Sequence, residues 1–276
     1  MSKALQYILG DIPTLPGGRT DQPFLIRRDG KLSLHFDHLT MQSQMRMDAP
    51  DALALGYTRT MMGFLLFNPT PRRIAMIGLG GGSLAKYCLR HIPVAHFTAV
   101  EINPAILKFR DEFNIPEDGP RFKVICADGA DYVRDVSEAV DVLLVDGFDA
   151  CSPPPGLCSS SFYAGCHDKL DEGGVMVVNL WGGDGEHELF LSRIRESFGR
   201  QAVMINSERD GNRIVFAVKG GSFPPEESLL VSRAIEPDHQ HPIKLKATIQ
   251  KILGKLKPNL PLKKARKARS LTSFTG

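Results

Sequence analysis

Apolar residues in this chain gather in short runs, and four runs in its middle each end near a glycine or a carboxylate. Segments with helical spacing separate these runs, which predicts parallel strands with helices on both faces of one sheet. The carboxyl ends of parallel strands meet at one edge, where open α/β sheets bind their ligands. The predicted strands are residues 74–77, 97–100, 122–126 and 140–145, and the residues that follow them include Gly78, Glu101, Asp128 with Gly129, and Asp146.

The first strand continues directly into a glycine turn, I-G-L-G-G-G-S, and a helix is predicted over residues 84–91. Gly78, Gly80 and Gly82 form a G-x-G-x-G pattern, which lets the backbone turn sharply and lets a ligand approach where a Cβ would clash. Glu101 follows Gly78 by 23 residues, about where such sheets place the acid that receives two ribose hydroxyls. Together these features predict a site for an adenosine-type ligand.

The glycine spacing differs from the G-x-G-x-x-G of dinucleotide-binding folds, because the third small residue comes one position early. That difference favours an S-adenosylmethionine-like ligand over NAD. A fifth strand is predicted over residues 175–180, and residues 201–206 and 212–219 read as an antiparallel hairpin around S-E-R-D-G. Parallel strands followed by such a hairpin are typical of the doubly wound, Rossmann-like sheet of class I S-adenosylmethionine-dependent methyltransferases.

Three regions are expected along the chain. Residues 1–50 hold a small β-hairpin unit, because residues 24–27, 31–36 and 39–42 alternate between polar and apolar and are separated by turn residues. Residues 51–220 form the catalytic domain, which opens with a helix capped by Asp51. Residues 221–276 read as a linker and a basic tail.

Charge is distributed unevenly. Residues 243–276 hold ten Lys or Arg and no Asp or Glu, which leaves 24 basic and 31 acidic side chains in the rest of the chain. An acidic body suits a cationic substrate, although it also serves solubility. The tail reads as a solvated segment or as a weak contact to nucleic acid through residues 263–269.

Composition indicates a cytoplasmic protein without a membrane span. Hydrophobic residues make up 42% of the chain, but no apolar stretch approaches the length of a membrane span, and the N-terminus lacks the order of a signal peptide. The five cysteines are odd in number and spread over several predicted elements, which suits reduced thiols. Three of them fall near one another without C-x-x-C spacing, so no metal site is expected.

The order of motifs resembles the spermidine synthase family of aminopropyltransferases, in a divergent, bacterial-type branch. The resemblance covers about residues 24–218 and rests on Gln42, Tyr57, I-G-L-G-G-G, V-E-I-N-P-A-I, A-D-G and V-D-G-F-D. It implies that decarboxylated S-adenosylmethionine donates an aminopropyl group to a small amine, without a permanently bound cofactor. A homodimer is expected.

The resemblance also implies roles for individual residues. Glu101 would hold the ribose hydroxyls, Asp128 and Gly129 would meet the adenine, and Gln42 would reach the nucleoside from the N-terminal unit. On the acceptor side, Asp146 would take the proton of the attacking amine. Asp149 and Tyr57 would help to hold that amine.

Three positions depart from the family pattern. Ser83 stands where the family's glycine motif carries an Asp that helps to fix the positive end of the donor. Tyr57-Thr58-Arg59 replaces Tyr-His-Glu, which removes a carboxylate and adds a cation near the expected path of the amine. The loop after Asp149 also lacks the family's D-P-x-G-P. Two alternatives to aminopropyl transfer therefore stay open: a methyltransferase that uses complete S-adenosylmethionine, and a nucleoside-binding protein without catalysis.

Overall fold

The structure, a computed structural model, describes residues 6–8, 19–37, 40–147, 154–180, 185–209, 211–221, 223, 225–235 and 241–256. Its centre is a seven-stranded sheet in the order β10-β11-β9-β8-β5-β6-β7. Strands β5 to β9 are parallel, and β11 and β10 complete the sheet as an antiparallel hairpin. The strands are β5 (Arg73–Ile77), β6 (His96–Glu101), β7 (Phe122–Cys126), β8 (Val140–Val145), β9 (Leu170–Leu180), β10 (Ala202–Asn206) and β11 (Arg213–Val218).

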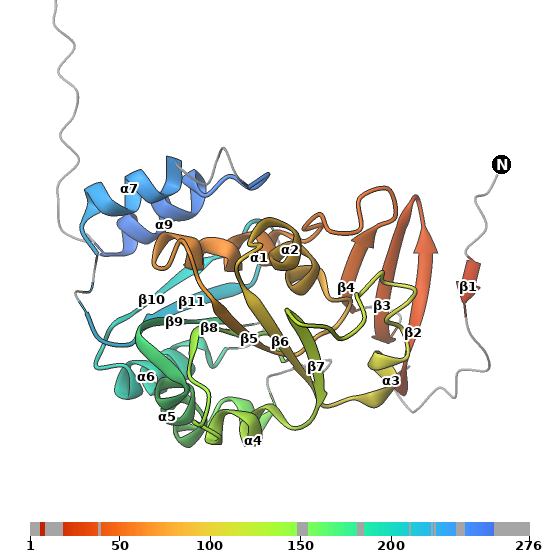
Figure 1. Cartoon of the computed structure of the whole chain (residues 1–276), viewed down its shortest axis with the longest axis horizontal. Coiled ribbons are helices and arrows are strands. Elements are labelled where there is room, and N and C mark those ends of the chain that lie inside the picture. The colour runs from red at the N-terminus through yellow and green to blue at the C-terminus, as the bar shows by residue number, and fades with distance from the viewer. Residues whose placement is uncertain are drawn as a thin grey trace, which may run out of the picture.

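The N-terminal unit is an antiparallel sheet in the order β1-β2-β3-β4. Its strands are β1 (Gln6–Ile8), β2 (Arg19–Arg28), β3 (Lys31–Asp37) and β4 (Met41–Arg46). It lies beside the β7 edge of the central sheet, at the end of the molecule opposite to the C-terminal helices (Figure 1). The predicted hairpin unit is present, and its last strand spans Met41–Arg46 rather than residues 39–42, with a register shift where it pairs with β3.

Helices cover both faces of the central sheet (Figure 1). The helices α1 (Gly56–Met61), η1 (Met62–Leu66), α2 (Ser83–His91), α7 (Glu227–Ile235) and α9 (Lys246–Leu256) contribute to one core, and α4 (Gly129–Arg134), α5 (Ser160–Lys169) and α6 (His187–Ser197) contribute to the other. Short segments α3 (Pro104–Leu107) and η2 (Pro155–Leu157) complete the set. Strand β8 lies between the two cores with Val142, Leu143 and Leu144 fully buried, as a near-continuous apolar run predicts.

Helix ends follow local chemistry at most of the predicted positions. Asn103 caps α3 by accepting a hydrogen bond from the Ala105 N–H (2.9 Å), and Pro104 is the first helical residue. The helix expected to start at Asp51 is different: α1 begins at Gly56 and has no side-chain cap. Asp51 instead forms an ion pair with Arg90 of α2 (2.7 Å). A tertiary ion pair therefore replaces the predicted cap.

The C-terminal stretch is more structured than the expected linker and tail. Two helices, α7 and α9, lie side by side there (Figure 1). Ile243, Leu245, Ile249 and Ile252 are all at most 5% exposed and belong to the core on the α1 face. Helical spacing of Ile and Leu was visible in the sequence, but the surface that buries them is formed by β10 and η1. The basic cluster at residues 263–269 lies outside the described residues.

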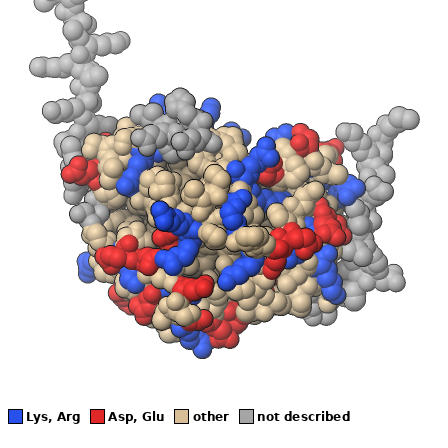
Figure 2. Space-filling view, in the orientation of Figure 1, with Lys and Arg blue, Asp and Glu red and all other residues tan. Residues whose placement is uncertain are grey.

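The surface has no large area of one charge on the face in Figure 2, where basic and acidic side chains are interspersed. Within the described part of the chain, no helix is long and apolar enough to cross a membrane. The cysteines among the described residues are free thiols, and Cys88, Cys158 and Cys166 are buried.

Candidate active site

The carboxyl ends of β5 and β8 form the point from which the chain winds in opposite directions. β5 pairs with β8 on one side and with β6 on the other, which creates the crevice where open sheets bind ligands. Gly78 ends β5 with φ +86°, and a Cβ there would lie 2.3 Å from the carbonyl oxygen of Asp146. The Asp146 N–H donates to the Ile77 carbonyl (2.9 Å). Glycine at position 78 therefore lets the turn and the loop after β8 touch.

The glycine turn packs against residues from two distant segments. Gly82, at φ +65°, precedes α2, and a Cβ there would lie 2.6 Å from Ile115. Gly80 lies beside Ser43 of β4, which a Cβ would meet at 3.6 Å. The N-terminal unit thus contacts the glycine turn through Ser43, and the predicted contact of Gln42 with a nucleoside stays a prediction.

Gln42 is adjacent to that contact and occupies an irregular position. Leu34 pairs with Ser43 while His35 pairs with Met41, so Gln42 is an extra residue on β4. Such bulges redirect side chains and are common next to active sites. The Gln42 side chain is partly buried.

Glu101 holds the backbone of the glycine turn. Its Oε2 accepts from the N–H of Leu79 (2.9 Å) and of Gly80 (3.5 Å), and its Oε1 accepts from the Asn103 N–H (2.9 Å). The side chain is 5% exposed. A carboxylate offers about four acceptor sites, and these three bonds leave one of them, on Oε1, for a ligand hydroxyl; a second hydroxyl would replace the long bond from Gly80. Sequence reasoning placed the residue correctly at the edge but missed its role in fixing the turn.

Asp128 and Gly129 follow β7 at the same edge. Asp128 is exposed and caps α4 by accepting from the Ala130 N–H (2.7 Å). A Cβ on Gly129 would lie 2.3 Å from the Ile77 side chain at the end of β5. Both residues are therefore close to the glycine turn.

Asp146 is the titratable group at the centre of the crevice. Its Oδ1 accepts from the Asn179 side-chain amide (2.8 Å), and Tyr57 of α1 also bonds to it. Burial raises the pKa of Asp146 to about 6, against the opposing effect of these two hydrogen bonds. A carboxylate whose pKa lies near neutrality is suited to accept a proton at physiological pH. The structure thus brings Tyr57 and Asp146 together, while Asp149 lies outside the described residues.

Two asparagines behind Asp146 were not predicted. Asn179 lies in β9 and is 4% exposed, and its Oδ1 accepts from the side-chain amide of Asn212 (2.9 Å), which is 9% exposed. A possible signal was the occurrence of Asn179 inside the apolar run V-V-N-L. A polar residue at a buried strand position needs a hydrogen-bond partner.

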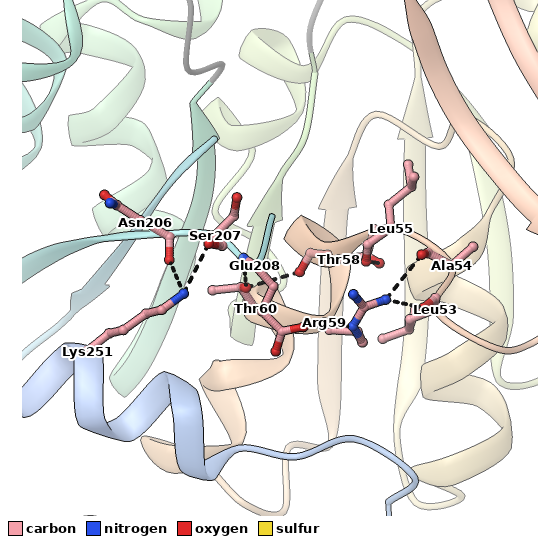
Figure 3. Close-up of polar contacts among 11 residues, drawn as sticks. Leu53, Ala54, Leu55, Thr58, Arg59, Thr60, Asn206, Ser207, Glu208 and Lys251 are labelled. Atoms are coloured by element: carbon pink, nitrogen blue, oxygen red, sulfur yellow. Dashed lines mark hydrogen bonds and ion pairs between the residues drawn. The ribbon is translucent and has the colours of Figure 1, made fainter. Parts of the chain in front are cut away.

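Arg59 does not contribute an unpaired cation to the site. Its guanidinium forms an ion pair with Glu208 (3.0 Å) and donates to the carbonyls of Leu53 (2.8 Å) and Ala54 (3.1 Å), as Figure 3 shows. Positions 57 and 59 are two apart on α1, so their side chains project from nearly opposite sides of the helix. The departure at Arg59 therefore joins α1 to the β10–β11 turn.

The chain is similar to known proteins over most of its length. The spermine/spermidine synthase domain matches residues 54–190. The polyamine aminopropyltransferase of Chromobacterium violaceum is 38% identical over 213 residues, which span 76% of this chain and 82% of that protein.

Solved structures share the fold. A probable spermidine synthase from Corynebacterium glutamicum superimposes with a TM-score of 0.65 at 19% identity, covering 83% of this chain and 87% of that one. Human methyltransferase-like protein 13 in complex with SAH gives a TM-score of 0.60 at 22% identity, covering 78% and 98% respectively. The predicted methyltransferase-like fold and the predicted family are both confirmed. The chain belongs to the spermine/spermidine synthase family.

Proposed function

We propose that this enzyme transfers an aminopropyl group from decarboxylated S-adenosylmethionine to the amine of a small polyamine. The amine nitrogen attacks the methylene carbon bound to the sulfonium. The carbon–sulfur bond breaks, its electron pair stays on the sulfur, and methylthioadenosine leaves. The proton released by the attacking nitrogen passes to Asp146.

The residues form two edges of one crevice in this proposal. The donor edge comprises Gly78–Gly82, Glu101, Asp128 and Gly129, with Gln42 approaching from β4. The glycine turn gives space for the donor, and Glu101 binds its ribose hydroxyls. Asp128, the most exposed carboxylate of this edge, would lie beside the adenine.

The acceptor edge comprises Asp146, Tyr57 and Asn179, with Asp149 following in the same loop. Asp146 and Asp149 attract the cationic acceptor, and Tyr57 holds Asp146 in place from α1. An ammonium is unreactive until it loses a proton, so the amine requires a base within hydrogen-bond reach.

The observation that carries the proposal is the contact between the two edges. A Cβ on Gly78 would lie 2.3 Å from the backbone carbonyl of Asp146, so the main chain of Asp146 adjoins the glycine turn, and burial raises the pKa of its carboxyl to about 6. The proposed base is therefore held beside the turn to which the donor is assigned. Membership of the family supplies the reaction class.

Methyl transfer from S-adenosylmethionine is the second candidate. Ser83, the first residue of α2, replaces the Asp that the family pattern uses to fix the positive end of the donor. Loss of that carboxylate weakens the selection against a donor that keeps its own carboxylate.

The test uses the complete chain, both donors and a panel of amines. Mass spectrometry should show aminopropylated amine only with the decarboxylated donor, and calorimetry should show that this donor binds more tightly. A preference of at least tenfold for S-adenosylmethionine, about 1.4 kcal/mol, contradicts aminopropyl transfer. Binding without turnover for every amine supports a nucleoside-binding protein instead.

Three expectations stay predictions. The protein forms a homodimer, which light scattering checks. It acts in the cytoplasm, which imaging of the tagged chain in cells checks. Residues 263–269 are either a solvated tail or a weak contact to nucleic acid, and a gel-shift measurement at several salt concentrations distinguishes the two.

A further inference from the structure

Behind the acceptor edge, two side-chain amides form a chain of hydrogen bonds that ends at Asp146. The Asn212 amide donates to Asn179, and the Asn179 amide donates to Asp146, at 2.9 and 2.8 Å. We propose that Asn212 is a positioning residue that acts through Asn179 to set the proton affinity of Asp146. This inference rests on the proposed function for its kinetic test and on geometry for everything else.

The directions of these hydrogen bonds follow from their chemistry. An ionised carboxylate only accepts hydrogen bonds, so Asn179 must present its NH₂ to Asp146. Its carbonyl oxygen then faces Asn212, which must present an NH₂ in turn. Because Asn179 and Asn212 are both nearly fully buried, water does not readily substitute for either partner. Asn212 therefore stabilises the orientation that Asp146 requires, because it donates to the Asn179 carbonyl and leaves the Asn179 NH₂ for Asp146.

The position of Asn212 is fixed by the described residues of the hairpin turn, 207–209 and 211–212, between β10 and β11. The Asn212 carbonyl accepts from the Ser207 N–H (2.9 Å). From α1, Thr60 accepts the Glu208 N–H (3.1 Å) and Arg59 pairs with the Glu208 carboxylate (3.0 Å).

The same turn is held from the other side by α9. The Lys251 ammonium donates to the carbonyls of Asn206 (2.9 Å) and Ser207 (3.0 Å), as Figure 3 shows. Thr60 is fully buried, so the turn is anchored in the core and at its outer side. Helix α9 thus supports the turn that holds Asn212, the first residue of the hydrogen-bond chain to Asp146.

Among the described residues, few groups influence the protonation of Asp146. Asn179 contacts it from β9 and Tyr57 contacts it from α1, and burial opposes its ionisation. Of these two partners only Tyr57 carries a titratable group. A change in the direction of the Asn179 amide should therefore be visible in the titration of Asp146.

The decisive variant is Asn212→Asp, which keeps the size of the side chain and reverses its hydrogen bonding. A carboxylate at position 212 accepts the Asn179 NH₂, so the Asn179 carbonyl turns toward Asp146 and opposes its ionisation. The acidic limb of the kcat/KM–pH profile should move up by about one pH unit, which lowers the rate about tenfold below that limb. The donor's affinity should stay within twofold.

Two further variants separate this role from charge and from packing. Asn212→Leu removes the amide without adding charge and should move the limb in the same direction by about half a unit. Asn206→Asp places the same charge in the same hairpin on an exposed side chain and should leave the limb unchanged. Should Asn212→Asp fail to fold, Asn212→Leu against Asn206→Asp makes the same comparison.

A second measurement does not depend on turnover. Carbon-13 NMR of labelled aspartate carboxyls, with Asp146→Asn to assign the signal, follows the pKa of Asp146 directly. The pKa of Asp146 should rise in Asn212→Asp and stay unchanged in Asn206→Asp. An unchanged Asp146 titration in both Asn212 variants overturns the inference, whereas a wild-type chain with no turnover but with the expected NMR shifts overturns only the proposed function.

Discussion

The donor edge and the acceptor edge of the crevice are built in different ways. Apart from Gln42, the donor edge is formed by residues at or just after the ends of β5, β6 and β7, which lie near one another because parallel strands end together. The acceptor edge joins Tyr57, Asp146, Asn179 and Asn212, which come from α1, β8, β9 and the β10–β11 turn. Local motifs thus determine one edge, and long-range packing determines the other. Substitutions at the two edges should therefore fail differently.

The largest effect is expected at the donor edge. Glu101→Ala removes hydrogen bonds that are worth roughly 1.5–3 kcal/mol each to a charged group, so donor binding should fall below detection in calorimetry. Because Glu101 also holds the N–H groups of Leu79 and Asn103, the melting temperature should fall as well. Donor affinity within threefold of the parent would show that the nucleoside pocket is misplaced. Asp128→Ala is the milder companion, since that side chain is exposed.

Asp146→Asn should separate catalysis from binding. Turnover should fall by roughly 10² to 10⁴ while donor affinity stays constant, and higher pH should restore part of the rate because more amine is already neutral. Initial rates and calorimetry on one preparation measure both. Full turnover in this variant would remove Asp146 from the mechanism.

The same substitution should lower activity but raise stability at alkaline pH. The pKa of Asp146 is about 6 in the folded chain and about 3.9 when unfolded, so the folded state binds this proton more tightly. Stability of the wild type is therefore lost as the pH rises from about 4 through 6. At pH 8 this difference in pKa makes Asp146→Asn more stable than the wild type by up to about 3 kcal/mol, so the variant should unfold at a higher temperature there. At pH 4 the two melting temperatures should be similar. A lower melting temperature at pH 8 would instead indicate that Asp146 only stabilises the loop.

Ile252→Ala tests whether α9 belongs to the folded body. Its side chain is fully buried, and such a truncation costs about 2–5 kcal/mol. Lys255→Ala, on an exposed position of the same helix, should stay within about 0.5 kcal/mol. Denaturant unfolding compares the two. Equal stabilities of the two variants would show that residues 221–276 act as a linker and tail. In that case a chain ending at Gly220 should fold and keep its donor affinity.

Arg59→Met should have the smallest effect. Its ion pair with Glu208 is partly exposed, at 29% for both side chains, so its loss together with two carbonyl contacts should cost about 1 kcal/mol. Because Thr60 and Lys251 also hold the turn, kcat/KM should stay within twofold. A large gain in acceptor affinity would show that Arg59 repels the amine. Glu208→Gln, alone and combined with Arg59→Met, measures the coupling between them.

The sequence by itself determined the central domain closely. The strands over 122–126 and 140–145 and the helix starts near Pro104 and Ser160 agree with the structure, because apolar runs, glycine breaks and caps act over a few residues. The same local signals placed Gly78, Glu101, Asp128 and Asp146 at the carboxyl edge of the central sheet. Because parallel strands all end at that edge, the position of a residue at a strand end is enough to predict that it lies there.

Tertiary structure alone decided the rest. Asp51 pairs with Arg90 rather than capping a helix, Arg59 pairs with Glu208, and α9 buries Ile249 and Ile252 in the core. The hydrogen-bond chain from Asn212 through Asn179 to Asp146 likewise joins residues that are 33 positions apart at each step. Contacts at such separations depend on how sheets and helices pack. The type of a residue limits which partners its side chain can bond, but the fold decides which of those partners lies within reach.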